Sequence, residues 1–595
     1  LIHIPPFPLD ISVTAYYLKA TNITYEQYLE NLNQHNQEFM NLQKDILKNA
    51  NEYTKTRYEI ISMSIQKLIE TNKDFSDLLL LISLMDSQNI PRELLDNYKN
   101  KATIDKFIYH LKKYSLLLNT EIANTFSLHR STKEIMLHCL KTSLKLGPNN
   151  QILEAILSNF ERFLSEATEH ENYEKMKILI SHAESLLKHA SLFNKLGVAK
   201  LRGTLGYLYY LLADFEYART LLEKNFNFLS KYKEYQNSNI LARTSTYLGI
   251  FHWGFGHFKE SLFLLEGSEK SYLKNHVYDY WGLARNLLYL GMVYWDIHQR
   301  EKARIFFEKA LNIYNRYLPN HYLDKAFTLS YLGTTYISTD LKKTKEYLDK
   351  SIDLLKKNFK ENHVKYAWVL SDLGIYYSTI GEYQKAVDLD KQVLKIYKEH
   401  YPENSTNVAW ALRNLGSHYC YLGEFKKSKD MLKKSFMIFK NSMGENNVKT
   451  KYILHLLGIV HLKMGDTKKA KKIFEDCYLY YKKENGNNNL HAVHALKNLG
   501  RSYIIEGDFQ KAEFHLKKAL ELYKNNHSFY SEDVFEALYE LYSQKSKSSK
   551  GKQKVVYKQQ AIEYLKQALK ILKDKYPKTS PHLTRIQEKL TEVDS

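Results

Sequence analysis

The sequence predicts an all-α protein whose larger part is a solenoid of stacked helix pairs, and three repeated features predict it. A Leu-Gly-x-x-Tyr/His motif recurs eight times, with its glycines 41 to 43 residues apart. Small residues and a second, turn-forming glycine then follow at fixed distances. The motif glycines are Gly206, Gly249, Gly291, Gly333, Gly374, Gly416, Gly458 and Gly500. A constant period over some 300 residues indicates one helix-turn-helix unit stacked on itself.

Small side chains mark two positions where the two helices of a unit can approach closely. One lies twelve residues after the motif glycine, or eleven in the one short repeat, and the other lies seven residues further on. These residues are Ala218, Ser261, Ala303, Thr344, Ala386, Ser428, Ala470 and Ala512, then Ala310, Ser351, Ser435, Cys477 and Ala519. Between the motif and these positions stands a turn such as Gly423-Glu424-Phe425, whose glycine supplies the positive φ that ends a helix. Each unit is therefore expected to be a helix, a tight turn and an antiparallel helix.

This pattern resembles the tetratricopeptide repeat, in the 42-residue form of kinesin light chains. The stretch from Asn407-Val408-Ala409 through Asn414-Leu415-Gly416 to Tyr419 is similar to the family consensus. The resemblance covers roughly residues 200 to 525, and we assign residues 201–540 to the array. It implies a right-handed α-solenoid whose concave face, lined by the first helix of each unit, binds proteins or peptides.

The resemblance also implies which side chains point inward, from their distance to the motif glycine. The candidate partner-binding residues are Asp372, Arg413, Asn414, Lys497, Asn498 and Arg501. Arginine and lysine suit carboxylates, and asparagine can pair with a peptide backbone in both senses. We therefore expect an acidic protein or peptide partner on the concave face. The alternative is a solvated inner face without a partner.

Ahead of the array, residues 53–145 have the outline of a winged helix. Apolar helical faces come first. Two apolar segments, 114–118 and 125–128, then flank the polar turn Asn119-Thr120, which is a hairpin signal. A helix from His129 to Leu144 follows.

The order of these elements resembles the carboxyl part of an NB-ARC signalling ATPase. Pro6-Phe7-Pro8-Leu9 is similar to the family's Gly-Leu-Pro-Leu motif, and Leu128-His129-Arg130 stands where the family has Met-His-Asp. The resemblance implies that Pro8 packs near an adenine and that His129 reaches the β-phosphate of ADP. The expected domains are a helical ARC-like remnant at 1–52, the winged helix at 53–145, a helical connector at 146–200, the array at 201–540, and a basic loop with a degenerate last repeat at 541–595.

The chain contains no Gly-x-x-x-x-Gly-Lys-Ser/Thr phosphate loop. We therefore expect no enzyme activity, no metal site and no cofactor in this chain. Its start at Leu1, without methionine, predicts a fragment, and the resemblance implies ADP or ATP with magnesium in the intact protein.

Composition narrows the class of partner and the compartment. The net charge of +20 comes from lysines spread along the whole chain, which favours solvated helix faces over a nucleic-acid site. No apolar run approaches the roughly 20 residues of a membrane helix. Cys139, Cys420 and Cys477 form no pair motif, which predicts reduced thiols and a cytoplasmic protein.

Three functions compete at this stage. The first is the sensor and winged-helix part of a nucleotide-switched signalling protein, which could oligomerise when activated. The second is a free-standing tetratricopeptide adaptor. The third is a winged-helix transcription regulator. It is the weakest, because the helix from Thr103 to Leu111 carries few basic side chains that could face a DNA groove.

Overall fold

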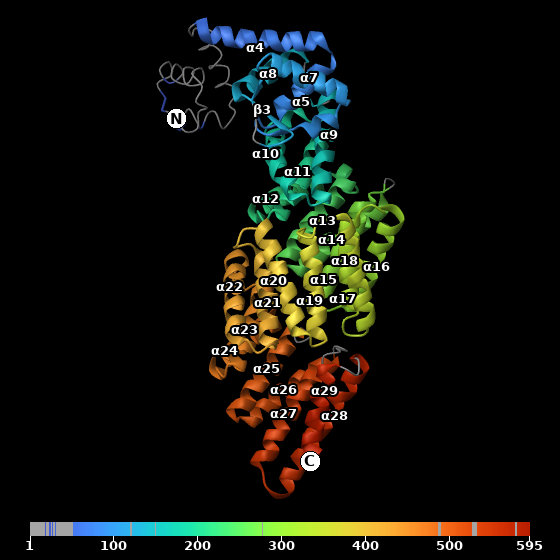
Figure 1. Ribbon diagram of the computed structural model, residues 1–595, viewed down its shortest axis with the longest axis vertical. Coiled ribbons are helices and arrows are strands. Elements are labelled where there is room, and N and C mark those ends of the chain that lie inside the picture. Colours follow the sequence, from blue (N-terminus) through green and yellow to red (C-terminus); the bar gives the residue numbers. More distant parts are fainter. Residues whose placement is uncertain are drawn as a thin grey trace. The chain divides into compact units, whose positions relative to one another are not determined.

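The computed structural model describes residues 52–118, 122–144, 146–148, 150–275, 278–485, 490–525, 532–576 and 580–594, with Leu18, Ile23, Thr24, Glu26, Gln27 and Glu30. These residues form 26 α-helices, two short 3-10 helices and three short strands, which confirms the all-α class. The chain divides into two compact units, Leu1–Leu208 and Tyr209–Ser595 (Figure 1). Pro8 and nearly all of the predicted 1–52 segment lie outside the described residues.

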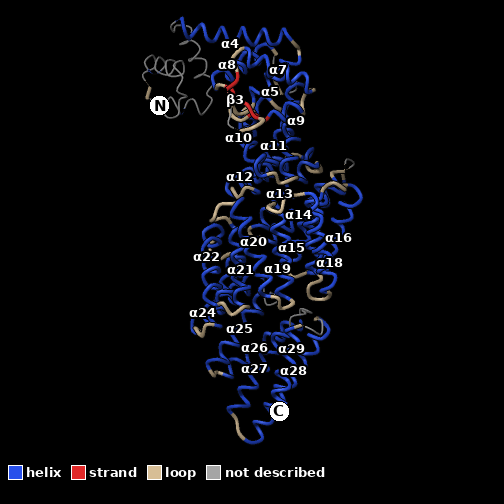
Figure 2. The backbone as a smooth tube through the Cα atoms, in the orientation of Figure 1, coloured by secondary structure: helices blue, strands red, loops and turns tan. Residues whose placement is uncertain are grey.

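The first unit combines helices with a small sheet. Its helices are α4 (Glu52–Thr71), α5 (Asp74–Leu84), α6 (Arg92–Asp96), α7 (Lys101–Lys113), α8 (Arg130–Ser143), α9 (Gln151–Glu169), α10 (Tyr173–Lys188) and α11 (Lys195–Leu211), which continues into the second unit. Its strands, red in Figure 2, are β1 (Ile90–Pro91), β2 (Leu117–Leu118) and β3 (Thr125–Leu128). The core of this unit includes α5, whose residues from Leu78 to Leu84 are all buried.

The predicted hairpin is present, and a third strand joins it. β2 pairs antiparallel with β3, with Leu117 opposite Leu128, and β1 pairs with the other side of β3. The proline at position 91 of the sequence, next to Arg92, is compatible with the first turn of a helix. Instead Pro91 ends β1 and caps α6, because an edge strand tolerates a residue without an N–H donor.

The second unit consists of consecutive helices packed side by side (Figure 1). After α12 (Phe215–Lys231), each motif glycine lies in a first helix: α13 (Asn239–Gly254), α15 (Tyr280–Asp296), α17 (Tyr322–Thr335), α19 (Val364–Thr379), α21 (Thr406–Tyr421), α23 (Val448–Lys463) and α25 (Leu490–Glu506). The second helices are α14 (Phe258–Lys274), α16 (Arg300–Tyr317), α18 (Leu341–Asn358), α20 (Tyr383–His400), α22 (Phe425–Met443), α24 (Thr467–Asn485) and α26 (Phe509–Asn525). α27 (Glu532–Ser548), α28 (Gly551–Lys575) and α29 (Pro581–Asp594) end the chain.

Hydrogen bonds from the small residues tie the two helices of a unit together. Ser261 Oγ donates to the carbonyl oxygen of Gly249 at 2.8 Å, and Ser268 Oγ donates to that of Ala242 at 2.7 Å. The partners run in opposite directions along the chain, so α13 and α14 are antiparallel. The same two bonds recur between α21 and α22. The predicted positions of close helix contact are thereby confirmed in these units.

A motif glycine is required where the second helix presses against the first. A Cβ atom added at Gly416 would lie 2.7 Å from the side chain of Leu432, which is too close for any real contact. Gly374 is an exception, because Asp390 stands there in place of the leucine or phenylalanine. The nearest atom to a Cβ at Gly374 would be Asp390 Oδ1, at an ordinary 3.5 Å.

The turn between the two helices keeps a left-handed residue even where glycine is lacking. Gly423 has φ of 81°, as its position in the motif predicts. Ala213 and His298 occupy the same position in their repeats, with φ of 65° and 64°. The geometry of the turn therefore overrides the residue's preference at these two sites.

The prediction of a basic loop in the 541–595 segment, at residues 543–554, is wrong. α27 continues to Ser548 and α28 begins at Gly551, which leaves only two residues between them. The run is rich in lysine, a good helix former, and contains no proline; its one glycine, Gly551, stands at the start of α28. α27 and α28 pack as a further helix pair, in which Ala561 and Ala568 are fully buried.

Candidate functional site

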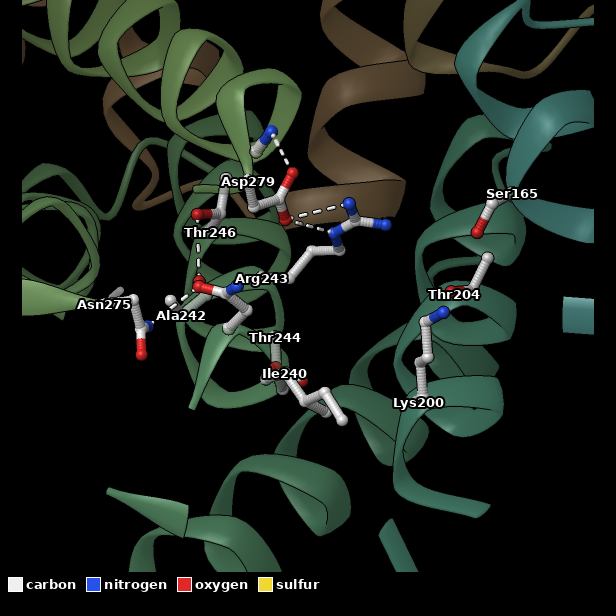
Figure 3. A network of polar contacts seen from close by, with 12 residues as sticks. Ser165, Lys200, Thr204, Ile240, Ala242, Arg243, Thr244, Thr246, Asn275 and Asp279 are labelled. Carbon is white, nitrogen blue, oxygen red and sulfur yellow. Dashed lines mark hydrogen bonds and ion pairs between the residues drawn. The ribbon is translucent and has the colours of Figure 1, made fainter. Parts of the chain in front are cut away.

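The first helices of successive repeats are joined by polar side chains, and we call this series of pairs the ladder. Arg243 on α13 donates to Asp279, the residue that caps α15, at 2.8 Å (Figure 3). Trp253 Nε1, also on α13, donates at 2.8 Å to Asp296 Oδ2 on α15. Each pair links residues 36 to 43 positions apart, about one repeat. The ladder therefore fixes one first helix against the next.

Two of the predicted partner-binding residues belong to this ladder. Asp372 accepts a hydrogen bond from Ser330 Oγ at 2.6 Å, and burial raises the pKa of its carboxyl group to about 7. Asn414 Nδ2 donates to Ser371 Oγ at 2.6 Å. Both side chains are buried. Each therefore holds neighbouring repeats together, and its role in partner binding stays a prediction.

Two predicted basic residues are paired with carboxylates of the next repeat. Lys497 Nζ lies 2.9 Å from Asp533 Oδ2, and Arg501 Nε lies 3.1 Å from Glu540 Oε2. Burial works to raise the pKa of Asp533, but Lys497 and Arg501 hold it well below its usual range. Much of the positive charge that these two residues would offer an acidic partner is therefore compensated within the chain.

Asn498 lies in a group of buried imidazoles. Its Nδ2 atom is 3.0 Å from His455 Nε2. Burial lowers the pKa of His455 to about 3 and that of His491 to about 4, so both rings are neutral at pH 7. A neutral His455 accepts the amide proton of Asn498, which makes this contact another rung of the ladder.

Arg413 differs from the other predicted bases. Its guanidinium carbon lies 4.4 Å from the centroid of the Trp410 ring and 5.5 Å from that of Tyr452. It forms no ion pair with any residue that the structure describes. Burial lowers the pKa of Arg413, which shows how little solvent surrounds the charge.

Lys449 completes what we call the inner cluster, made of Trp253, Asp296, Trp410, Arg413 and Lys449. The Lys449 ammonium lies 4.7 Å from the Trp253 ring and 5.5 Å from the Trp410 ring. Burial lowers its pKa to about 8. Burial also raises the pKa of Asp296, although Lys449, Trp253 and Arg413 act against that shift.

The cluster forms where the coil of repeats meets itself. Lys449 Nζ donates to the carbonyl oxygen of Gly254 at 2.8 Å, and Asn447 Nδ2 donates to that of Phe255 at 2.7 Å. One repeat further along each side, the rings of His298 and His491 lie 4.9 Å apart. In both cases the two contacting repeats are five units apart in sequence.

The first helices of the repeats, with the turns that follow them, form what we call the inner face of the array. Some of its side chains are open to solvent yet surrounded by protein. Tyr421 leaves 63% of its surface exposed, although burial raises the pKa of its hydroxyl group. His298 is also exposed, and burial lowers the pKa of its ring well below the usual value. Exposure combined with such desolvation is expected where neighbouring protein surrounds an accessible side chain, as in a hollow of the surface. The Tyr421 ring stacks on that of Tyr383, with 5.2 Å between the centroids.

His129 lies in the first unit, directly after β3 and at the start of α8. Its Nδ1 atom is 2.8 Å from Ser131 Oγ, and the residue is buried. Pro8, its predicted partner in nucleotide binding, lies outside the described residues. The suggested role of His129 therefore stays a prediction.

Sequence reasoning missed Trp253, Asn447 and Lys449. Trp253 stands four residues after its motif glycine, within the range to which the resemblance directed attention, but it was not singled out. Asn447 and Lys449 precede their motif glycine by eleven and nine residues, outside that range. Asp324 and His491 occupy the same position as Lys449 and also contact the preceding repeat, through Trp281 and Tyr452 respectively. The polar residues recurring at this position were the available signal.

Comparison with known proteins identifies the repeats. The tetratricopeptide-repeat family model matches residues 337–399, 407–483 and 469–525, and a second model of that description matches residues 284–317. These segments are tetratricopeptide repeats. They make the array a scaffold for protein interaction. No curated protein matches the chain.

Several solved structures are similar to parts of this chain. BtubC (BKLC) from P. vanneervenii is 20% identical, with a TM-score of 0.31, over 39% of this chain and 91% of its own. A signal transduction ATPase with numerous domains and a tetratricopeptide repeat sensor, from Pyrococcus horikoshii, is 13% identical, with a TM-score of 0.38, over 80% and 69%. A Rap protein complexed with competence and sporulation factor is 14% identical, with a TM-score of 0.48, over 67% and 99%.

The described residues offer neither a metal-binding cluster nor a membrane-spanning helix. No group of three or more histidine, cysteine or acidic side chains there is placed to hold a metal ion. None of the helices in this part of the chain combines the length and the apolar character that crossing a membrane requires.

Proposed function

We propose that the array binds a segment of a partner protein on its inner face, as the sensor part of a nucleotide-switched signalling protein. The observation that supports binding on this face is the enclosed but accessible surface around Tyr421 and His298. Such a surface contacts a guest from several sides, which buries more of it than a flat surface would.

The aromatic and polar residues there suit a peptide. The stacked rings of Tyr383 and Tyr421 offer apolar area with few rotamers to restrict, and their hydroxyl groups can bond a peptide backbone. Because Lys497 and Arg501 are paired with Asp533 and Glu540, the preference for an acidic partner rests mainly on Arg413.

The switched part of the proposal is supported by the first unit. Its order of helix, strand, two helices, hairpin and helix resembles that of a winged helix, and β3 leads directly to His129. A single buried histidine beside Ser131 does not hold a nucleotide by itself, and the sequence contains no phosphate loop. The residues described here therefore do not fit ADP on their own, and we derive no step through it.

Photo-crosslinking at one inner and one outer position tests the first part of the proposal. A photoreactive phenylalanine analogue at Tyr421 should give adducts with a partner in the cells that make the protein. The same analogue at Phe263, a second-helix residue that is 76% exposed, is the matched control. Equal or greater yield of the same adduct from Phe263 would place the partner elsewhere.

Nucleotide content tests the second part. We expect this chain to bind ADP very weakly in calorimetry, and micromolar binding would contradict that. Protein isolated from its natural source should release ADP on denaturation if it is a switched sensor. If no ADP is released, the free-standing adaptor is favoured instead.

A further inference from the structure

The ladder lacks a carboxylate at Arg413. Arg413 and Lys497 are the only arginine or lysine residues that stand three positions before a motif glycine, so they occupy the same place in their repeats. Lys497 is paired with Asp533, which follows it by 36 residues. The residue 36 positions after Arg413 is Lys449. A second cation therefore stands where the other repeat provides an acid.

The other type of rung is missing there as well. Arg501 is paired with Glu540 and Arg285 with Asp324, in each case 39 residues further on. The residue 39 positions after Arg413 is Tyr452, whose ring lies 5.5 Å from the guanidinium carbon. Neither of the two sequence separations, 36 and 39 residues, at which these bases find a carboxylate leads from Arg413 to one.

Nearby acids do not replace the missing partner. Asp296 receives the indole N–H of Trp253, and Asp390 lies 2.6 Å from His418 Nδ1. Both lie near enough to act on the charge of Arg413, but neither forms an ion pair with it. The Nε atom of Arg413 is shielded from solvent and has no hydrogen-bond partner among the described residues. Charges enclosed in this way are normally paired, because an unpaired one is costly to bury.

We propose that a carboxylate of the bound protein segment fills this place, bridging Arg413 and Lys449 beside the Trp410 ring. Both cations face that ring, at 4.4 Å and 5.5 Å from its centroid. The Lys449 ammonium uses one donor on the carbonyl of Gly254 and has two more to offer. Arg413 keeps part of its surface exposed, and a guanidinium binds a carboxylate with two parallel hydrogen bonds. This inference rests on the proposed function and names the group that the inner face recognises.

A mixture of acetylated heptapeptides of randomised sequence tests the proposal at constant ionic strength. One form has a free C-terminal carboxylate and no acidic side chain, a second is amidated without acidic side chains, and a third is amidated with one glutamate. The full chain, immobilised, should retain the first or the third form at least about tenfold better than the second, as expected for a desolvated charge pair. Whichever form is retained identifies the source of the carboxylate.

Substitutions assign the effect to this pair of cations. Arg413→Gln and Lys449→Gln should each abolish the preference for carboxylate peptides. Lys497→Gln removes the same charge from a paired rung and should preserve the preference. Tyr452→Glu places a carboxylate 39 residues after Arg413, the same sequence separation that joins Arg501 to Glu540 and Arg285 to Asp324. It should remove the preference while raising the melting temperature, which excludes misfolding as the cause.

The outcomes separate this inference from the proposed function. Retention of all three forms alike, or a preference that survives Arg413→Gln, would overturn the carboxylate site and leave binding on the inner face standing. Failure of the wild-type chain to retain any of the three mixtures would overturn both proposals.

Discussion

The ammonium group of Lys449 donates to the carbonyl oxygen of Gly254 across 2.8 Å and 195 positions of sequence. Gly254 ends α13, where the helix dipole places partial negative charge, so the contact is favourable for a cation. Two residues earlier than Lys449, Asn447 reaches the carbonyl oxygen of Phe255. These bonds close the coil between repeats five units apart, and the inner cluster depends on that closure.

Changing Asn447 to aspartate tests the closure. Asn447 caps α23 through Oδ1 and donates to Phe255 through Nδ2, so aspartate keeps the cap and loses the long-range bond. We expect thermal unfolding to show a loss of about 1–2 kcal/mol, because a partly buried carbonyl group is left beside a carboxylate. Ser405 caps α21 at the same place in its repeat, and Ser405→Asp should change stability by less than about 0.5 kcal/mol. Equal losses in both variants would argue against the closure.

Two motif glycines should respond differently to alanine. Gly416→Ala is expected to cost about 1–3 kcal/mol, since its Cβ would overlap Leu432. Gly374→Ala meets only ordinary contacts, and the better helix propensity of alanine should stabilise the protein by about 0.5–1 kcal/mol. Thermal melts of the two variants check this. Similar destabilisation by both would mean that Asp390 does not leave the space we describe.

The helix pairs could be predicted from the sequence because each depends on contacts within about 26 residues. The motif glycine, the serines that bond back to it and the turn glycine all act inside one repeat. The hairpin of the first unit was predictable for the same reason.

The inner cluster could not be predicted, because it depends on how tightly the repeats coil. Nothing local in the sequence indicates that Lys449 meets Gly254, and a slightly different coil would separate them. Arg413 was recognised as an inward base, but its lack of a carboxylate became visible only beside Lys497 and its partner Asp533. The pairing of the inner bases was therefore the main point that required the structure.

The turn positions without glycine offer a stabilising change. Ala213 is held at φ of 65°. This backbone conformation destabilises a residue with a Cβ atom by about 1–2 kcal/mol. Ala213→Gly should therefore raise the free energy of unfolding by up to about 1 kcal/mol, after the greater flexibility of glycine in the unfolded chain is allowed for. Gly423→Ala, the reverse change at the same position, should lower it by a similar amount. Denaturant titrations of both variants check the signs, and a stabilised Gly423→Ala would contradict the reasoning.

The buried carboxyl group of Asp372 should make stability depend on pH. Burial raises its pKa from 3.8 to about 7, while the bond from Ser330 acts in the opposite direction. Below about pH 4 the folded and unfolded states both hold the proton. Between about pH 4 and 7 only the folded state holds it, so stability falls with rising pH by up to about 1.4 kcal/mol per unit. Above about pH 7 both states are ionised, and this contribution stops changing.

Asp372→Asn should remove that decline. An amide oxygen can still accept the hydrogen bond from Ser330. Asparagine is also the natural residue at the same place in two later repeats, as Asn414 and Asn498, so the substitution suits the fold. Unfolding free energies of both proteins, measured in denaturant at several values between pH 4.5 and 7.5, should differ little at the acid end. The variant should be increasingly the more stable toward pH 7, and a constant difference would show that Asp372 does not carry a raised pKa in the folded protein.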